Sequence, residues 1–374
     1  MVSDEKPSYR LNSAYLYLTS GCNLKCSHCW LTPSFVPETE EAPEGITADD
    51  VRKIIKEGRP IGLFNIKLTG GEPFLNRDIF EIIEVVSSEE LVLDIETNGT
   101  LIDEKTAAFL KRSNASSISV SIDGSDPRFH DSFRGVEGSW EDAVRGVEHM
   151  VSQGLKVQII MSLIGDNSGD IEGVVAMARR LNADSVKFNP VMPVGRGEKL
   201  TEGGKTIPVD ELIRLSSWAE KELNEKYRIK TFFTIPTAFK KIDSFFKGNN
   251  AQCHILNIIG VIASGHISIC GIGKEVPDLV IGNIREDNLE DVWRNSPVLS
   301  ELRRIVPDNM KGICGMCILK GLCLGSCRAN AYVLHGDLSA PDRICQEAYE
   351  MGLFPETRII WSDDDQDRKF GTKK

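Results

Sequence analysis

The sequence lacks an excess of positive charge. Its 374 residues include 44 Lys and Arg against 55 Asp and Glu, which gives a formal net charge of −11. Proteins that bind nucleic acid generally carry a basic face, so this balance argues against that class. We therefore expect no nucleic-acid partner.

Long apolar runs are also missing. No uninterrupted run approaches the roughly 20 residues that a membrane-spanning helix needs. The opening stretch, MVSDEKPSYRLNSAY, has no basic segment followed by an apolar one, so it does not resemble a secretory signal. These absences predict a soluble, cytoplasmic protein without a membrane partner.

Cysteine is absent from residues 30–252, although the chain has ten cysteines. Three lie within residues 22–29 and seven lie between residues 253 and 345. Cysteines that only pack in a core would be scattered, because a free buried cysteine behaves as a small hydrophobe. The reducing cytosol disfavours disulfides, so clustered thiols there indicate metal binding or redox chemistry.

Residues 14–224 alternate apolar runs with amphipathic stretches. Strands are predicted at 14–20, 64–70, 91–97, 116–123, 156–163 and 185–191, and helices at 77–86, 105–112, 139–153, 170–181 and 209–223, with another that begins after Thr47. Strands separated by helices pair in parallel. The strands are apolar rather than strictly alternating, as expected of strands covered by helices. The pattern predicts an α/β fold over residues 1–224, either a partial barrel or an open doubly wound sheet.

The rest of the chain has a different character. From about residue 225 the periodicity weakens and the cysteines return. We expect a linker at 225–252 and a small cysteine-rich domain at 253–350 that depends on metal for stability. A polar tail is expected at 351–374, and its final stretch, SDDDQDRKFGTKK, is expected to be disordered.

The first three cysteines occur in GCNLKCSHCW, directly after the first predicted strand. In parallel α/β folds the sites form at the carboxyl ends of the strands. A [4Fe–4S] cluster normally takes four cysteines, so three would leave one iron for a substrate or cofactor. A zinc site completed by His28 or by a distant residue is the alternative.

The spacing Cys22-x3-Cys26-x2-Cys29 resembles the signature of radical S-adenosylmethionine (SAM) enzymes. The resemblance implies a partial (β/α)6 barrel and a cluster whose open iron chelates the amino and carboxylate groups of SAM. An electron from the reduced cluster would cleave SAM to a 5′-deoxyadenosyl radical, which abstracts hydrogen from the substrate. The electron donor would be of the ferredoxin or flavodoxin type.

Further stretches at the ends of predicted strands are similar to motifs of the same family. GGEP at 70–73 would lie along the methionine amino group, the serine of SIDG at 121–124 would face the cofactor, and Arg134 would pair with its carboxylate. The cofactor-binding residues that the resemblance implies are His28, Gly70, Gly71, Glu72, Asn98, Ser121, Asp123, Arg134 and Met192.

Each of these residues also has a plain structural interpretation. GGEP and SIDG are both typical of turns at strand ends, and asparagine at position 98 is typical of a turn. Arg134 could be an ordinary surface arginine, and Met192 could simply pack in the core. His28 stands where the family usually has an aromatic residue near the adenine, so it could stack there or contribute only its backbone.

The seven later cysteines follow the pattern C-x11-G-x4-C, a gap, C-x2-C-x5-C-x3-C, a gap and C. This pattern is similar to the SPASM domain of radical SAM enzymes, which holds two auxiliary [4Fe–4S] clusters. The resemblance assigns Cys253, Cys270 and Cys327 to the first cluster. It assigns the remaining four to the second cluster: Cys314, Cys317, Cys323 and Cys345. Zinc in the C-x2-C-x5-C-x3-C segment is the alternative.

With three clusters, every cysteine is a cluster ligand. The first auxiliary cluster would have only three cysteine ligands, so we expect its open iron to contact the substrate. No thiol remains to return a hydrogen atom to a substrate radical, which argues against a peptide epimerase. Sulfatase-maturing members carry an aspartate after the cysteine that matches Cys270, where this chain has Gly271. They also carry an additional cysteine after the position of Cys253.

The resemblance therefore favours an oxidoreductase that oxidatively modifies a ribosomally synthesised precursor peptide. Only 21 residues precede Cys22, so we expect a separate protein to recognise any leader peptide, unless a short peptide binds directly. Tailoring of a tetrapyrrole or another small molecule is the alternative, and sulfatase maturation is a weaker one. An iron–sulfur electron-transfer or scaffold protein is the alternative from a different class.

Overall fold

The structure, a computed structural model, describes residues 9–37, 43, 45–241 and 253–361. Its residues form two units. Unit one comprises Met1–Ile207, Trp218–Thr234 and Ile255–Ser300, and unit two comprises Pro208–Ser217, Ile235–His254 and Glu301–Lys374. Across the described ranges, no helix has the length and apolar character needed to cross a membrane.

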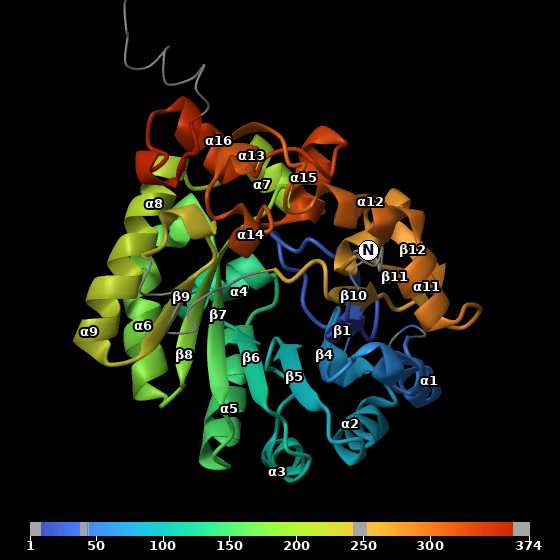
Figure 1. Cartoon of the computed structure of the whole chain (residues 1–374). Helices are drawn as coiled ribbons and strands as arrows, with labels where there is room; N and C mark the ends of the chain where they lie inside the picture. The colour runs from blue at the N-terminus through green and yellow to red at the C-terminus, as the bar shows by residue number, and fades with distance from the viewer. Residues whose placement is uncertain (1–8, 38–42, 44, 242–252, 362–374) are drawn as a thin grey trace, which may run out of the picture. The chain divides into compact units, whose positions relative to one another are not determined.

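Unit one is built on a large, mostly parallel sheet (Figure 1). Within the described residues the sheet has ten strands in the order β12-β11-β10-β1-β4-β5-β6-β7-β8-β9. The six predicted strands are confirmed as neighbours that pair in parallel. They are β1 (Ser13–Tyr17), β4 (Asn65–Thr69), β5 (Val92–Thr97), β6 (Ser117–Ser121), β7 (Val157–Leu163) and β8 (Ser185–Pro190).

Four further strands extend this sheet beyond the prediction. β9 (Lys230–Phe233) pairs in parallel with β8, and β10 (Ile258–Val261) pairs in parallel with β1. β11 (His266–Ser268) and β12 (Val280–Asn283) continue from β10 in antiparallel pairs. β9 falls in the range expected to be a linker, and β10 to β12 fall in the range expected for the cysteine-rich domain. Residues 362–374 of the expected tail lie outside the described residues.

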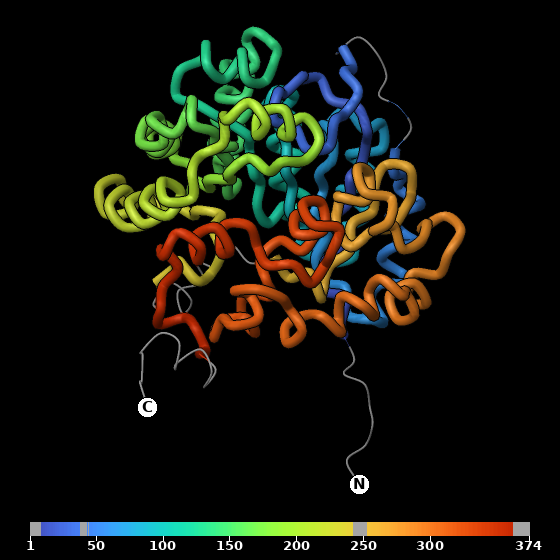
Figure 2. The backbone as a smooth tube through the Cα atoms, turned by 90° about the horizontal axis from the view of Figure 1, so that it is seen from above, coloured from blue at the N-terminus to red at the C-terminus, as the bar shows by residue number. Residues whose placement is uncertain are grey.

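The predicted helices of unit one are confirmed. They are α1 (Ala48–Gly58), α2 (Ile79–Ser88), α3 (Glu104–Arg112), α5 (Ser139–Ser152) and α6 (Ile171–Arg180). Thr47 is the N-cap of α1, and its hydroxyl accepts the N–H of Asp50 at 3.1 Å. Seen from above, the chain of unit one passes from the blue first strands to the green α5 and α6 around an arc (Figure 2).

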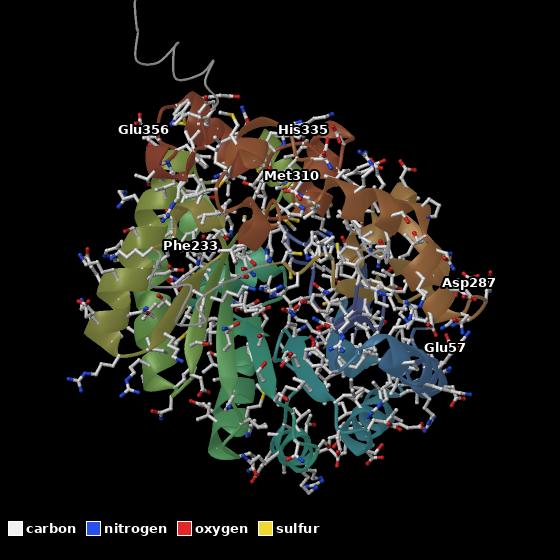
Figure 3. All side chains as sticks on the ribbon, in the orientation of Figure 1. Glu57, Phe233, Asp287, Met310, His335 and Glu356 are labelled. Carbon is white, nitrogen blue, oxygen red and sulfur yellow. The ribbon has the colours of Figure 1, made fainter. Side chains whose placement is uncertain are left out.

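Additional short elements complete unit one. They are β2 (Gly21–Cys22), β3 (Ser34–Phe35), α4 (Pro127–Arg134), α7 (Gly197–Glu202), α9 (Asn224–Tyr227) and α11 (Leu289–Asn295). The N–H of Leu289 donates to Glu57 of α1 at 2.7 Å, and Lys53 donates to the carbonyl of Asp287 at 2.9 Å. Glu57 and Asp287 are labelled in Figure 3. These bonds attach the segment 255–300 to α1.

The sheet has two different faces, which corrects the expectation of apolar strands. Alternate residues such as Leu16, Leu68 and Val120 are fully buried. The positions between them are polar, as in the sequences NIKLT of β4 and SISVS of β6. Such alternation means that one face packs in a core while the other meets a more polar environment.

Unit two is helical in its described part. Its helices are α13 (Gly312–Met316), α14 (Lys320–Cys323), α15 (Arg328–His335) and α16 (Arg343–Glu350), and α8 (Val209–Trp218) and α12 (Pro297–Ile305) contribute residues to both units. Its apolar cluster contains Val209, Ala238, Ile313, Cys317, Leu319, Cys345, Ala348 and Phe354. Because cysteines belong to this cluster, the core and the expected metal ligands of unit two share the same space.

Candidate active site

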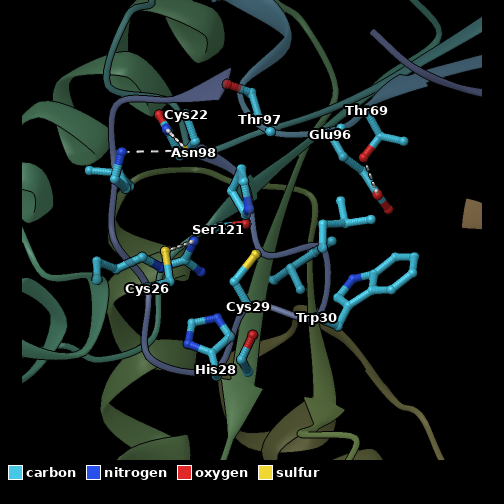
Figure 4. A pocket seen from close by; sticks show the side chains of 18 of the residues that line it. Cys22, Cys26, His28, Cys29, Trp30, Thr69, Glu96, Thr97, Asn98 and Ser121 are labelled. Atoms are coloured by element: carbon cyan, nitrogen blue, oxygen red, sulfur yellow. Dashed lines mark hydrogen bonds between the residues drawn. The ribbon is translucent and has the colours of Figure 1, made fainter. Parts of the chain in front are cut away.

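The first three cysteines line one cavity of about 190 Å³ in unit one (Figure 4). Cys22 is the last residue of β2, and Cys26 and Cys29 lie on the loop that follows. Ser121 and Arg134, two of the residues predicted to bind the cofactor, line the same cavity.

The surroundings of these thiols suit an iron–sulfur cluster. Cys22 and Cys26 are buried, and burial raises the pKa of Cys22 to about 12. The N–H of Leu24 donates to the sulfur of Cys22 at 3.4 Å, and Arg134 donates to the sulfur of Cys26 at 3.7 Å. Coordination to a metal deprotonates a thiol, and donors to the sulfurs stabilise the resulting thiolates.

The three thiols of the cavity do not form a site for a single metal ion. Over the described ranges, no three His, Cys, Asp or Glu side chains come close enough to share a single metal ion. A cubane cluster instead takes one thiolate on each iron, so its ligands need not converge on one point. The soft donors around this cavity fit a cluster by their chemistry.

The cysteine loop is held from two sides. The N–H groups of Lys25 and Ser27 donate to the carbonyls of Arg134 and Phe133, each at 2.9 Å, at the end of α4. Arg196 donates from its guanidinium to the carbonyl of Cys26 at 3.1 Å and from its backbone to the carbonyl of Cys29 at 3.0 Å. Arg196 was not predicted, because a single arginine in the turn PVGRG resembles an ordinary loop residue.

The motif Gly70-Gly71-Glu72 packs against the start of the cysteine loop. The N–H of Gly71 donates to the carbonyl of Thr19, and the N–H of Glu72 donates to the carbonyl of Gly21, both at 2.9 Å. A side chain at position 71 would overlap with the Gly21 carbonyl, so this position requires glycine. Gly70 and Gly71 line the cavity.

Glu72 points away from the cavity into the protein. Its carboxylate is fully buried and accepts the hydroxyl of Thr97 at 2.7 Å and the N–H of Asn98 at 2.8 Å. Burial raises the pKa of Glu72 to about 7, although these donors lower it. The structure therefore gives Glu72 a role in positioning the end of β5, and its direct contact with a cofactor stays a prediction.

Asn98 was predicted with the cofactor residues, and it does line the cavity. Its side-chain amide donates to Asn23 at 2.8 Å and faces the sulfur of Cys22 at 3.9 Å. Its carbonyl oxygen accepts the N–H of Thr100 at 2.9 Å, as in an Asx turn. The turn at Asn98 is confirmed, and its contact with a cofactor stays a prediction.

A buried ion pair connects the SIDG motif to the cavity. Asp123 is fully buried, and its carboxylate accepts Nε of Arg134 at 2.6 Å and the N–H of Ser162 at 2.8 Å. Burial opposes ionisation of Asp123, but the guanidinium of Arg134 outweighs it, and the pKa of Asp123 is lowered to about 2. Asp123 does not line the cavity. It orients the guanidinium of Arg134, which does.

His28 lies in the cavity wall beside this pair. Its ring stacks on Phe133 with centroids 4.2 Å apart, and Nε2 lies 4.0 Å from Asp123. Burial lowers the pKa of His28 to about 3, so the imidazole is neutral. Within the described part of the chain, its buried Nδ1 has no hydrogen-bond partner.

Met192 is not among the described residues that line the cavity. The cavity instead includes side chains that the sequence analysis missed: Trp30, Thr69, Glu96, Thr97, Ser162 and Asn189. Most of them lie in the last residues of predicted strands, so the rule that sites form at strand ends could have found them. Glu96 forms an ion pair with the half-buried Lys67, and the pair raises the pKa of Lys67 and lowers that of Glu96, which keeps both groups charged.

Four of the later cysteines line a second, small cavity of about 10 Å³ in unit two. They are Cys314, Cys317, Cys323 and Cys345, the set predicted to hold the second auxiliary cluster. The rest of the lining is largely apolar and includes Met310, which Figure 3 labels. The N–H of Asp342 donates to the sulfur of Cys314 at 3.3 Å, and that of Leu319 donates to Cys317 at 3.4 Å. Four soft donors around a small space fit a cluster.

The remaining three cysteines stay assigned by prediction. Cys327 is the N-cap of α15, where its sulfur accepts the N–H of Asn330 at 3.4 Å, and it does not line the second cavity. Cys270 belongs to unit one, whereas Cys253 and Cys327 belong to unit two. The chemistry of this set, three thiols, suits iron–sulfur binding.

Comparisons with known proteins agree with this chemistry. Residues 16–178 match the model of the radical SAM superfamily, and residues 253–318 match that of an iron–sulfur cluster-binding domain, SPASM. An AdoMet-dependent heme synthase of Methanosarcina barkeri is 31% identical over 341 residues, which cover 88% of this chain and 94% of that protein. A PqqA peptide cyclase of Rhizobium meliloti is 26% identical over 88% of this chain and 85% of that protein.

A solved structure also resembles the chain. SuiB of Streptococcus suis, in a crystal structure with its precursor peptide SuiA, superimposes with a TM-score of 0.72 at 19% identity. The match covers 91% of this chain and 76% of SuiB. At this identity the likeness concerns the fold.

Proposed function

Because the chain belongs to the radical SAM superfamily and carries a SPASM iron–sulfur domain, it is an enzyme, and we propose that it oxidatively modifies a ribosomally synthesised peptide. The proposal assigns the SAM-binding cluster to Cys22, Cys26 and Cys29. When bound and reduced, that cluster would supply the electron that cleaves SAM. Two auxiliary clusters would complete the set, one on Cys314, Cys317, Cys323 and Cys345 and one on Cys253, Cys270 and Cys327.

The residues of the cavity have distinct parts in this proposal. Arg134, oriented by Asp123, would hold the carboxylate of SAM through charge-assisted hydrogen bonds. Ser121 would contact the cofactor from the end of β6. The glycines of GGEP have no side chain, so the backbone there would approach the methionine part of SAM closely. Glu72 would keep the end of β5 in place through its bonds to Thr97 and Asn98.

The charge of the cavity supports a peptide substrate. Beyond the thiols, most polar side chains of the lining are neutral hydrogen-bonding groups such as Thr69, Ser162 and Asn189. Arg134 is the only Lys or Arg among the described lining residues, and Asp123 already pairs with it. Neutral donors and acceptors suit peptide groups, whereas several carboxylates on one substrate would need matching cations.

Tetrapyrrole tailoring is the second candidate, because of the AdoMet-dependent heme synthases among the relatives. The Methanosarcina protein is 31% identical to this chain. A second heme synthase, from Oleidesulfovibrio alaskensis, is 26% identical, which equals the identity of the PqqA peptide cyclase. Sequence identity to the heme synthases is thus at least as high as that to the peptide cyclase, so it does not favour the peptide substrate.

The two candidates can be compared in one experiment. The protein is reconstituted with iron and sulfide under anaerobic conditions and mixed with SAM, a reductant and either a short precursor peptide encoded beside its gene or a tetrapyrrole with carboxylate side chains. We expect the peptide to lose hydrogen by mass spectrometry while 5′-deoxyadenosine forms. Loss of carboxyl groups from the tetrapyrrole, with the peptide unchanged, would overturn the peptide proposal.

A further inference from the structure

Arg328, the first residue of α15, is a buried cation in unit two. Its side chain has no exposed surface. Its guanidinium donates to three backbone carbonyls, those of Leu338 at 3.0 Å, of Ala340 at 2.6 Å and of Gly325. Within the described part of the chain it forms no ion pair, and its Nε has no hydrogen-bond partner.

These bonds do not account for the charge of Arg328. A neutral amide could donate to carbonyls as well, whereas a buried cation loses its hydration and needs a counter-charge. Arginine cannot avoid this cost by losing its proton. The carboxyl of Asp342 is also buried, but it accepts the N–H of Cys345 at 3.2 Å, and burial raises its pKa. The guanidinium therefore has no direct counter-ion among the described residues.

The guanidinium of Arg328 lies directly behind the wall of the second cavity. Gly325 lines this cavity together with its four cysteines. A Cβ atom at Gly325 would stand 2.7 Å from both Nε and Cζ of Arg328, so any larger residue would displace the guanidinium. Gly325 also has a φ of 74°, which favours glycine. The unpaired Nε is thus separated by one glycine from the space that the four thiols surround.

An iron–sulfur cluster on the four cysteines would supply the missing counter-charge. Four thiolates carry more negative charge than an oxidised cubane core carries positive charge, so the complete site is an anion. Reduction by one electron makes this anion more negative, and the net charge of a cluster is one of the quantities that set its potential. In a buried site a nearby cation acts strongly on such an anion, because little water screens the two charges.

We propose that Arg328 raises the reduction potential of the auxiliary cluster that the four cysteines of the second cavity would hold. This inference rests on the proposed function, which includes that cluster. A fixed cation stabilises the reduced form more than the oxidised form, because the attraction grows with the charge of the anion. Reduction adds one electron to the cluster, and the guanidinium keeps its proton. Arg328 is therefore a positioning residue for charge, and it neither ligates iron nor touches substrate.

The test is a potentiometric titration of the reconstituted full chain, followed by electron paramagnetic resonance. Cys22, Cys26 and Cys29 are replaced by alanine in this parent protein, so that the auxiliary clusters alone contribute. The step of the second cavity is the one that disappears when its four cysteines are replaced by serine. In Arg328→Gln we expect the ratio of reduced to oxidised cluster at a fixed potential to fall by about tenfold. This change equals a shift of about 59 mV for a one-electron couple.

Two control variants separate the charge from a packing role. Arg328→Lys keeps the charge but loses part of the hydrogen bonds, so we expect a potential near that of the parent protein even where stability falls. Arg304→Gln removes the same charge at the surface of unit two, where Arg304 pairs with Glu301, and should leave the potential unchanged. Iron content and melting temperature are measured for every variant.

Each outcome decides between these roles. An unchanged potential in Arg328→Gln with full iron content would overturn the proposal, and so would equal shifts in Arg328→Lys and Arg328→Gln. A shift confined to the other auxiliary step would also overturn it. Arg328→Met is prepared alongside and replaces Arg328→Gln if that variant does not retain iron. A parent protein in which no step depends on the four cysteines would overturn the cluster assignment of the proposed function itself.

Discussion

At the scale of single residues, the site depends on groups that do not face the cavity. Glu72 and Asp123 are fully buried, and each holds another residue of the site in place. Asp123 fixes the guanidinium of Arg134, and Arg134 donates to the sulfur of Cys26. The sequence motifs identified these positions, but they could not show which side chains line the cavity and which support it.

The Asp123–Arg134 pair gives a prediction for stability. Asp123→Asn would leave a buried guanidinium without its counter-charge, so we expect the free energy of unfolding to fall by about 3 kcal/mol. Urea unfolding of the metal-free protein measures this change. Asp126→Asn is the control, because Asp126 pairs with Arg128 at the surface and asparagine caps a helix as well as aspartate. Equal stability of both variants would contradict the prediction.

The first three cysteines give a prediction for chemistry. Replacement of Cys22, Cys26 and Cys29 by alanine removes the ligands of one cluster, so SAM cleavage should stop while most of the iron stays bound elsewhere. High-performance chromatography of 5′-deoxyadenosine and a colorimetric iron assay measure the two quantities. A triple variant that still forms 5′-deoxyadenosine would refute the assignment of this loop.

At the scale of elements, the strands that carry the site agree with the sequence prediction to within a few residues. Their apolar runs are local signals, and so is the Thr47 cap. β9 to β12 were missed because each has three or four residues and forms only by pairing with an edge supplied from elsewhere in the chain. The polar face of the sheet was missed for another reason: Lys67 and Glu96 lie within apolar runs and compensate each other only across neighbouring strands.

The attachment of the segment 255–300 to α1 gives a prediction about pH. Arg285 pairs with Asp50 at 3.0 Å. Burial alone would raise the pKa of Asp50, but the hydrogen bonds from Arg285 and Thr47 outweigh burial, so the pKa is lowered. A carboxylate with a lowered pKa contributes stability above its unfolded pKa, near 3.9, and loses it as the pH falls below that value. We expect Arg285→Gln to lower the free energy of unfolding by about 0.5–1 kcal/mol at pH 7.

Urea unfolding at pH 7 and pH 3 measures this difference. The gap between Arg285→Gln and the wild type should narrow at pH 3, where Asp50 begins to be protonated. Arg52→Gln is the control, since Arg52 pairs with Asp49 and Glu81 at the exposed surface and should have a smaller effect. A gap that widens in acid would contradict the assigned ion pair.

At the scale of the whole molecule, the cysteines divide among separate places. Three line the cavity of unit one, and four line the cavity of unit two. The resemblance of the cysteine spacing to known motifs predicted that each group holds one cluster, because the spacing of ligands along the chain is characteristic of a metal site. It could not predict the contacts of Tyr17 with Trp30 and Gly271, since these residues meet only in the folded chain.

The cluster assignment predicts the metal content of the protein. Three cubane clusters give about twelve irons per chain after anaerobic reconstitution. Replacing Cys314, Cys317, Cys323 and Cys345 by serine should remove about four of them. Elemental analysis measures both values. About four irons together with bound zinc would contradict two auxiliary clusters.

The position of β1 in the sheet also has a consequence for protein synthesis. β1 lies between β4 and β10, so one of its edges is completed only by residues near 258. At translation rates of about 5–20 residues per second, β1 leaves the ribosome roughly 10–50 s before β10. During that interval the nascent chain presents an unpaired parallel edge, which is a template for unwanted strand pairing. We therefore expect β1, which ends at Tyr17, to be the first segment of this protein that ribosome-associated chaperones bind.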